Sequence, residues 1–312
     1  MTDTKCARTS LTLGPVLFNW APEVWRDFYF RMADEAPVDS FVIGEVVCSK
    51  RAPFLAEHVP AVVERLQAAG RQVVLASPIL VTLERERDAV RDLVATADDI
   101  LADGFLIEAN DIGCLAQLAG RPHWIGPFVN TYNEASLAWM AGRGAVSVSL
   151  PGELSAGAIA VLAAAAAPLG VDLEVQVFGR LPLAISARCY HARAHNLHKD
   201  NCRFVCGVDV DGLDVTTVDG EAFLAINGTQ TLSSSYVALV AEVGDMQAMG
   251  VNRLRLSPHS CDMVAVTKLF RAIADGVIEA TEARSRLARI SHGIAFSNGF
   301  YHDREGVMDT LR

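Results

Sequence analysis

The chain has 312 residues, of which 51% are hydrophobic and 21% charged, and its formal net charge is −10. This composition is typical of a globular protein, and the length suits either one α/β barrel or two smaller domains. The longest basic cluster is Lys50-Arg51, which argues against nucleic acid or an anionic membrane as a partner. The longest apolar run, from Ala158 to Ala167, is too short to span a bilayer, and residues 1–15 hold no signal-peptide stretch. We therefore expect a cytoplasmic protein without a membrane span.

Short runs rich in β-branched residues alternate with helical patterns along most of the chain. The predicted strands are 11–16, 40–46, 72–76, 104–108, 123–129, 145–150, 173–178 and 252–256. The predicted helices are 22–36, 56–69, 84–100, 111–119, 133–142, 153–168, 235–249 and 262–275. Asn133 is a start signal for the fifth helix, and Gly70 and Gly170 are stop signals for the second and sixth.

Strict alternation of eight strands with helices predicts a parallel sheet, and eight is the strand count of a closed (β/α)₈ barrel. A Rossmann-type sheet would place a glycine-rich phosphate turn after its first strand, and the sequence contains no G-x-G-x-x-G. The predicted fold class is therefore α/β, a TIM-barrel-like single domain with its core at about 11–275.

One connection is far longer than the others, with more than fifty residues between the seventh strand and the helix at 235–249. We predict a cysteine-bearing insertion at about 189–234, with a hairpin around Gly212 and one more strand at 221–227. A loosely attached C-terminal tail is expected at about 290–312. Long excursions of this kind are usually functional.

Three cysteines in this insertion have the spacing C-x₁₂-C-x₃-C, namely Cys189, Cys202 and Cys206. In a reducing cytosol such a group indicates a soft metal site rather than disulfides. Iron–sulfur clusters generally take four thiolates. Cys48 follows the second predicted strand, and strands two and seven of a parallel barrel open on the same face, so Cys48 can supply the fourth.

Two other interpretations of these cysteines stay open. They are inert buried thiols, or they hold structural zinc, for which the loop also offers three histidines, His191, His195 and His198. Cys6, Cys114 and Cys261 have no partner at ligand spacing and are interpreted as spare thiols.

Polar side chains follow several predicted strands, at the face where barrel enzymes build active sites. They are Glu45, Glu108, Asn130, Glu153 and Arg188. Each of them is as well explained by helix capping or ion pairing, so the sequence assigns no catalytic residue. It contains no H-E-x-x-H and no G-x-S-x-G motif of peptidases.

The sequence resembles a known family from about residue 11 to about 275. The two most specific motifs are Gly44-Glu-Val-Val-Cys-Ser-Lys-Arg and Ser186-Ala-Arg-Cys. Further parts are 13–17, 105–113, 181–189, 227–233 and 255–258. Together they resemble the collagenase-like peptidase family, type U32, and within it members that act in ubiquinone biosynthesis.

The resemblance implies a [4Fe–4S] cluster on Cys48, Cys189, Cys202 and Cys206. It also implies a heterodimer with a sister subunit that has its own cluster, and oxygen-independent hydroxylation of the ubiquinone ring during anaerobic growth. Prephenate is the leading candidate for the oxygen donor, and a soluble lipid-carrier protein is expected to present the hydrophobic quinone precursor.

Two alternatives remain beside this interpretation. The first is an RNA base hydroxylase of the same broad family, which the acidic charge balance disfavours. The second is a non-catalytic partner that carries a cluster or zinc and stabilises a catalytic subunit.

Overall fold

The computed structural model describes residues 8–96 and 105–311. Eight parallel strands form a closed barrel, because each strand pairs with the next and the last also pairs with the first and the seventh. They are β1 (Ser10–Leu13), β2 (Ser40–Ile43), β3 (Gln72–Ala76), β4 (Leu106–Ala109), β5 (His123–Ile125), β6 (Ala145–Ser149), β7 (Asp172–Gly179) and β13 (Arg253–Leu256). The predicted fold class is confirmed.

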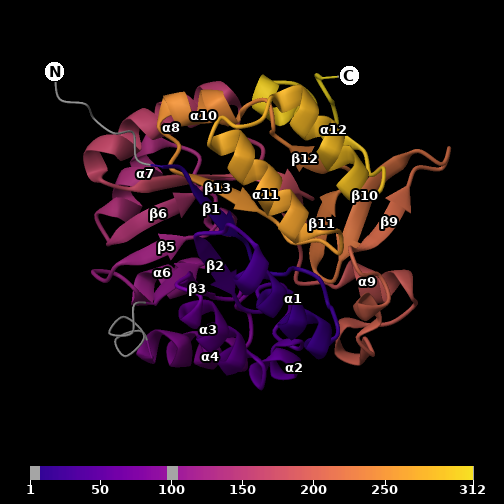
Figure 1. Ribbon diagram of the computed structural model, residues 1–312. Coiled ribbons are helices and arrows are strands. Elements are labelled where there is room, and N and C mark those ends of the chain that lie inside the picture. The colour runs from indigo at the N-terminus through magenta and orange to yellow at the C-terminus, as the bar shows by residue number, and fades with distance from the viewer. Residues whose placement is uncertain (1–7, 97–104, 312) are drawn as a thin grey trace.

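Helices surround the barrel and bury their apolar faces against it (Figure 1). They are α1 (Pro22–Glu35), α2 (Ala52–Ala56), α3 (Val59–Ala68), α4 (Glu84–Ala95), α6 (Ile112–Gln117), α7 (Glu134–Ala141), α8 (Ala156–Ala166), α10 (Val243–Met249), α11 (Met263–Ala274) and α12 (Ala280–Ile290). Asn133 caps α7 by accepting a hydrogen bond from Ser136 N at 2.9 Å, as its position predicts. The end of the third predicted helix, 97–100, and Gly104 of the fourth predicted strand lie outside the described residues.

The barrel interior contains a buried charged group where branched aliphatic side chains usually dominate. Arg255 on β13 donates to Glu108 on β4 at 2.7 Å and to Glu174 on β7 at 2.8 Å. All three side chains are buried. This ion pair network joins strands from opposite sides of the barrel.

The insertion forms a second, antiparallel sheet of four strands at one side of the barrel (Figure 1). Its strands are β8 (Pro182–Ile185), β9 (Leu213–Thr216), β10 (Ala222–Asn227) and β11 (Gln230–Ser233), with the short helix α9 (Tyr190–Ala194) after β8. The predicted strand at 221–227 is therefore confirmed.

The predicted hairpin around Gly212 is wrong. Gly212 ends a turn that precedes β9, since its N–H donates to Asp209 O at 3.0 Å. The hairpin is formed by β9 and β10, and its turn contains Gly220 at φ 85°, a conformation that glycine adopts without strain.

The first residues of the predicted helix 235–249 are instead a strand, β12 (Tyr236–Ala238). β12 pairs antiparallel with β7 and parallel with β14 (Phe296–Ser297), so all three of its residues are buried. Pairing with β12 also ties down the C-terminal stretch that we expected to be loosely attached. The predicted strand 123–129 ends early at Ile125, because Pro127 has no N–H for the ladder and begins a 3₁₀ turn. None of the described helices is both long and apolar enough to cross a bilayer.

Candidate metal centre

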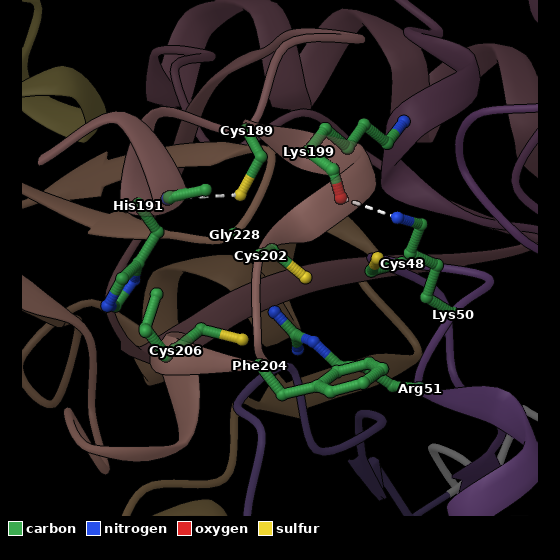
Figure 2. Close-up of a pocket in the computed structure, with 12 residues that line it drawn as sticks. Cys48, Lys50, Arg51, Cys189, His191, Lys199, Cys202, Phe204, Cys206 and Gly228 are labelled. Carbon is green, nitrogen blue, oxygen red and sulfur yellow. Dashed lines mark hydrogen bonds between the residues drawn. The ribbon is translucent and has the colours of Figure 1, made fainter. Parts of the chain in front are cut away.

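Cys48, Cys189, Cys202 and Cys206 line one small hollow, of about 20 Å³, between the barrel and the insertion. Figure 2 shows their side chains directed toward its middle from three separate stretches of backbone. The structure thus brings together all four predicted ligands. Cys114 and Cys261 lie outside this hollow, and Cys6 lies outside the described residues.

Cys48 is held by a tight loop after β2. The Glu45 carboxylate accepts hydrogen bonds from Val47 N and Cys48 N, both at 2.9 Å. Arg51 N then donates to Cys48 O at 2.8 Å and closes a turn that leads into α2. Glu45, which the sequence offered as a strand-end acid, therefore shapes the loop that presents the thiol.

The other three thiols come from short turns in the insertion. Cys189 is the N-cap of α9, and its Sγ accepts a hydrogen bond from Ala192 N at 3.4 Å. Cys202 and Cys206 flank a turn in which Phe204 has φ 54°, a left-handed conformation that is rare outside glycine. The Phe204 ring packs edge-on against Phe54 of α2 at 4.7 Å, which holds this turn on the barrel.

Hydrogen bonds from the insertion to the loops after β1 and β2 fix the hollow in place. Thr229 Oγ1 donates to Val47 O at 2.9 Å, and Asn227 Nδ2 donates to Leu17 O at 2.7 Å. Lys50 Nζ donates to Lys199 O, so the loop with Cys48 is tied to the loop with Cys202. Thiols far apart in the sequence are thereby held on one rigid frame.

A buried arginine faces the four cysteines. Arg51 is 1% exposed and donates through Nη1 to Leu17 O at 2.9 Å and through Nη2 to Asn227 Oδ1 at 3.2 Å. Its closest carboxylate, on Glu45, is 3.9 Å away. A side chain at Gly228 would not fit beside it, because a Cβ there would lie 2.5 Å from Arg51 Nη2.

Burial and Arg51 act in opposite directions on these thiols. Burial raises the pKa of Cys48 and of Cys206, and the positive charge of Arg51 opposes that rise. Without a bound cation, Cys48 and Cys206 therefore favour their neutral form. A metal group that takes the thiolates would keep a net negative charge, and Arg51 is placed to balance it.

The spacing of the sulfurs can be compared with the spacing of ligands around a single ion. Among residues 8–96 and 105–311, one group has three donor atoms within 4.8 Å of one another, and it consists of His191, His195 and Asp209. No three of the four cysteine sulfurs are that close. Thiolates on one tetrahedral zinc lie about 3.8 Å apart, given Zn–S bonds of about 2.3 Å. No three of the cysteine sulfurs are therefore as close to one another as the ligands of one zinc ion.

The histidines of the insertion do not point into the hollow as ligands of a zinc ion shared with the cysteines would. His191 lines the hollow, but its Nε2 is engaged with Asp209 Oδ2 at 2.8 Å, and its ring stacks on His195. His198 is exposed and does not line the hollow. His191 and His195 therefore pack against each other beside the cysteines, and His191 is held by Asp209.

The family model described as peptidase family U32 matches residues 29–310, which is most of the chain. The chain belongs to the U32 family. Among solved structures, the chain is similar to phospho-2-dehydro-3-deoxyheptonate aldolase (DAHP synthase) from Thermotoga maritima, with a TM-score of 0.43 and 10% identity over 93% of this chain and 72% of that one. It is also similar to a truncated 3-deoxy-D-arabino-heptulosonate 7-phosphate synthase from Thermotoga maritima, with a TM-score of 0.41 and 10% identity over 93% and 89% of the two chains.

The other polar residues that the sequence offered at strand ends do not line the cysteine hollow of this U32 chain. Glu108 is paired with Arg255 inside the barrel, and Arg188 is exposed. Asn130 and Glu153 line a second cavity at the barrel mouth, together with Gln176.

Two residues that matter for the geometry were missed by sequence reasoning. Arg51 was noted only as part of a short basic cluster, and Gly228 was not singled out. Adjacency of Arg51 to the Gly-Glu-x-x-Cys phrase was the available signal, since a buried charge beside a ligand loop is a usual way to tune a metal site.

Proposed function

We propose that this chain is a UbiV-like protein, the iron–sulfur component of an oxygen-independent hydroxylase of the ubiquinone ring in anaerobic ubiquinone biosynthesis. The observation that carries the proposal is that the motifs behind the family resemblance meet at one site. One hollow is lined by residues from three of these motifs, at 44–51, 186–189 and 227–233. The residues are Cys48, Cys189 and Gly228.

The proposed cofactor is a [4Fe–4S] cluster on Cys48, Cys189, Cys202 and Cys206. When bound, such a cluster supplies electron transfer, and with four thiolates it offers no open iron position. The chain's own residues hold it and balance its charge through the buried Arg51.

Peptidase chemistry is not proposed in spite of the family name. A cysteine peptidase needs a thiol within hydrogen-bond reach of an imidazole. Among the described residues, no cysteine sulfur makes a hydrogen bond to a histidine ring, and the His191 ring is already engaged with Asp209. Four thiols around one hollow also suit shared metal binding better than a single nucleophile.

A sister subunit, UbiU, is proposed as the partner in a cytoplasmic heterodimer, with a soluble lipid carrier and prephenate as the oxygen donor. Exposed apolar side chains on the insertion support a partner surface. They are Val208, Val210, Val218 and Phe223. The same surface is compatible with the second candidate, a non-catalytic cluster-bearing partner of a catalytic subunit.

Deletion of the gene tests the proposal. Ubiquinone should disappear only in cells grown without oxygen, with accumulation of precursors that lack a ring hydroxyl group. A plasmid copy with Cys114→Ala should restore synthesis, and a copy with Cys48→Ala should not. Label should pass from the hydroxyl of prephenate into the ring.

Other outcomes identify the alternatives. Normal anaerobic ubiquinone together with a defect in RNA modification would replace the proposal with the RNA base hydroxylase. Full complementation by folded Cys48→Ala protein that contains no iron would favour a structural role.

A further inference from the structure

Two histidines and one aspartate of the insertion lie together beside the cysteine hollow, and the proposed function does not use them. They are His191, His195 and Asp209, and one donor atom from each lies within 4.8 Å of the other two. No other three histidine, cysteine or carboxylate side chains within residues 8–96 and 105–311 come that close together. Imidazole and carboxylate groups are common ligands of transition-metal ions in proteins.

The two histidines share one face of the short helix α9. His191 lies in its first turn, and His195 is its C-cap, four residues further along the chain. Residues four apart on a helix are neighbours on its surface. The two rings are accordingly stacked, with their centroids 5.7 Å apart and their planes inclined by 10°. This spacing allows two histidines of one helix to bind a single ion.

Asp209 approaches the histidines from the loop before β9. Its Oδ2 lies 2.8 Å from His191 Nε2, and its backbone oxygen accepts a hydrogen bond from Gly212 N at 3.0 Å. Two ligand atoms that are each about 2.0–2.2 Å from one ion lie about 2.8–3.5 Å from each other, so this pair already has ligand spacing. In the ion pairs of the described residues, Asp209 meets His191 and no lysine or arginine, so no permanent cation neutralises its carboxylate.

The three side chains differ in burial in a way that suits an ion arriving from solvent. His191 is fully buried, the Asp209 side chain is 23% exposed, and His195 is exposed. The first two therefore form a fixed pair of ligands. The exposed ring of His195 can turn toward an ion held by that pair without disturbing the core, because exposed side chains change rotamer rapidly.

This group is a neighbour of the cysteines and is separate from them. His191 lies two residues after Cys189, and Asp209 lies three residues after Cys206. Figure 2 shows the His191 ring directed away from the four sulfurs. Imidazole and carboxylate are harder ligands than thiolates, and they suit a single divalent ion rather than an iron–sulfur cluster.

We infer that His191, His195 and Asp209 form a mononuclear site for a divalent transition-metal ion of the zinc or iron(II) class. Three protein ligands leave at least one coordination position for water or for a ligand group. The inference does not depend on the proposed function, because none of the three residues is a proposed ligand of the cluster.

Zinc binding to the anaerobically purified chain, after removal of loosely bound metal with a chelator, tests the site. Calorimetry should show one zinc ion bound per chain, and zinc should raise the melting temperature, because it binds the folded state. His195→Ala should weaken zinc binding at least about tenfold, which corresponds to about 1.4 kcal/mol, and should abolish the rise in melting temperature. His198→Ala is the matched control, since His198 is an exposed histidine of the same loop and lies outside the group.

Three results of these titrations would overturn the inference. They are the absence of zinc binding to the unchanged protein, equal affinity in the unchanged protein and His195→Ala, and equal loss of affinity in His195→Ala and His198→Ala. The last result would mean that zinc binds to the loop histidines without a defined site.

Asp209→Asn separates metal binding from a structural hydrogen bond. Asparagine keeps the shape of the side chain and can still form a hydrogen bond with His191, but it has no negative charge. Zinc affinity should fall at least about tenfold, and the melting temperature without zinc should stay close to that of the unchanged protein. Unchanged zinc affinity together with a lower melting temperature would assign Asp209 a structural role and overturn the inference.

Cobalt(II) in place of zinc identifies the ligands. An ion bound by imidazoles and a carboxylate gives weak d–d bands, whereas thiolate ligands add an intense sulfur-to-cobalt charge-transfer band. We expect d–d bands alone, and we expect His195→Ala to remove them. A charge-transfer band that persists in His195→Ala would place the ion on the cysteines and overturn the inference. Iron and sulfide assays on the same samples test the cluster separately, since protein without iron that binds zinc through His195 contradicts the proposed cofactor alone.

Discussion

Two buried arginines show how differently this molecule treats charge in its two centres. Arg255 lies inside the barrel with two carboxylates, Glu108 and Glu174, within 2.8 Å of its nitrogens. Arg51 lies at the cysteine hollow, where its closest carboxylate is 3.9 Å away and its hydrogen bonds go to neutral acceptors. The first charge is paired at hydrogen-bond distance with two carboxylates, whereas the second has one buried carboxylate at 3.9 Å.

This difference distinguishes a structural ion-pair network from a site that can bind an anionic group. An unpaired buried ion costs several kcal/mol, and a single carboxylate at 3.9 Å offsets only part of that cost for Arg51. At Arg51 the neighbouring groups are four thiols, whose pKa values burial raises at Cys48 and Cys206. Binding of a cluster with net negative charge would provide the compensation that Glu108 and Glu174 provide for Arg255.

The largest expected effect tests whether the hollow is a metal centre at all. Protein purified without air should be brown and hold about four irons and four sulfides per chain. Cys189→Ala should lose most of this iron, because one of the four thiolates is missing, and Cys114→Ala should keep it. Iron and sulfide assays with the absorbance near about 400 nm measure the result. Equal loss of iron from both variants, or colourless protein with one zinc, would contradict the assignment of the hollow as an iron–sulfur site.

The barrel and the choice of thiols could be predicted from the sequence, because both depend on local signals. Strand and helix periodicity repeats eight times, and β3 has the predicted bounds, Gln72–Ala76. Cys48 is brought to the hollow because β2 and β7 open on one face of a parallel barrel. These inferences need no knowledge of individual contacts.

The rest depended on contacts between distant segments. Local propensity predicted helix at β12. The segment is a strand because it pairs with β7 and β14, and local propensity contains no information on pairing between distant segments. The burial of Arg51 requires Leu17 and Asn227, which lie 34 and 176 residues away in the sequence. The cavity at the barrel mouth likewise needs a wall from the insertion.

The second prediction tests the compensated centre. Arg255→Met should destabilise the fold by about 3–5 kcal/mol, because two buried carboxylates lose their cation. Denaturant unfolding measures the change. Arg31→Met is the surface control, because Arg31 and its partner Asp262 are 50% and 48% exposed, and its cost should be at most about 1 kcal/mol. Equal costs would mean that the barrel network is no more than a surface ion pair.

The third prediction tests Arg51, the buried arginine with the weaker ion pairing. Arg51→Met should fold with a smaller loss of stability than Arg255→Met, but it should release iron to a chelator several times faster, because the negative charge of the cluster is no longer balanced. Arg51→Lys keeps the charge and should retain iron longer than Arg51→Met. Release at the wild-type rate from both variants would show that the charge of Arg51 does not act on the bound metal.

The smallest expected effect concerns the backbone that makes room for Arg51. Gly228 has φ 61° and Gly170 has φ 65°, so alanine at either position costs about 1 kcal/mol from the left-handed conformation. At Gly170 a new Cβ would meet no atom within 4 Å, whereas at Gly228 it would lie 2.5 Å from Arg51 Nη2. Gly228→Ala should therefore cost about 1–3 kcal/mol more than Gly170→Ala in denaturant unfolding.

The same pair of variants also separates stability from function at the hollow. If Gly228→Ala displaces the guanidinium from the cysteines, it should accelerate the release of iron as Arg51→Met does, and Gly170→Ala should not. Adding Gly228→Ala to Arg51→Met should then have little further effect on iron release, because the group that it displaces is already absent. Additive effects on release would instead show that the glycine and the arginine act on the cluster independently.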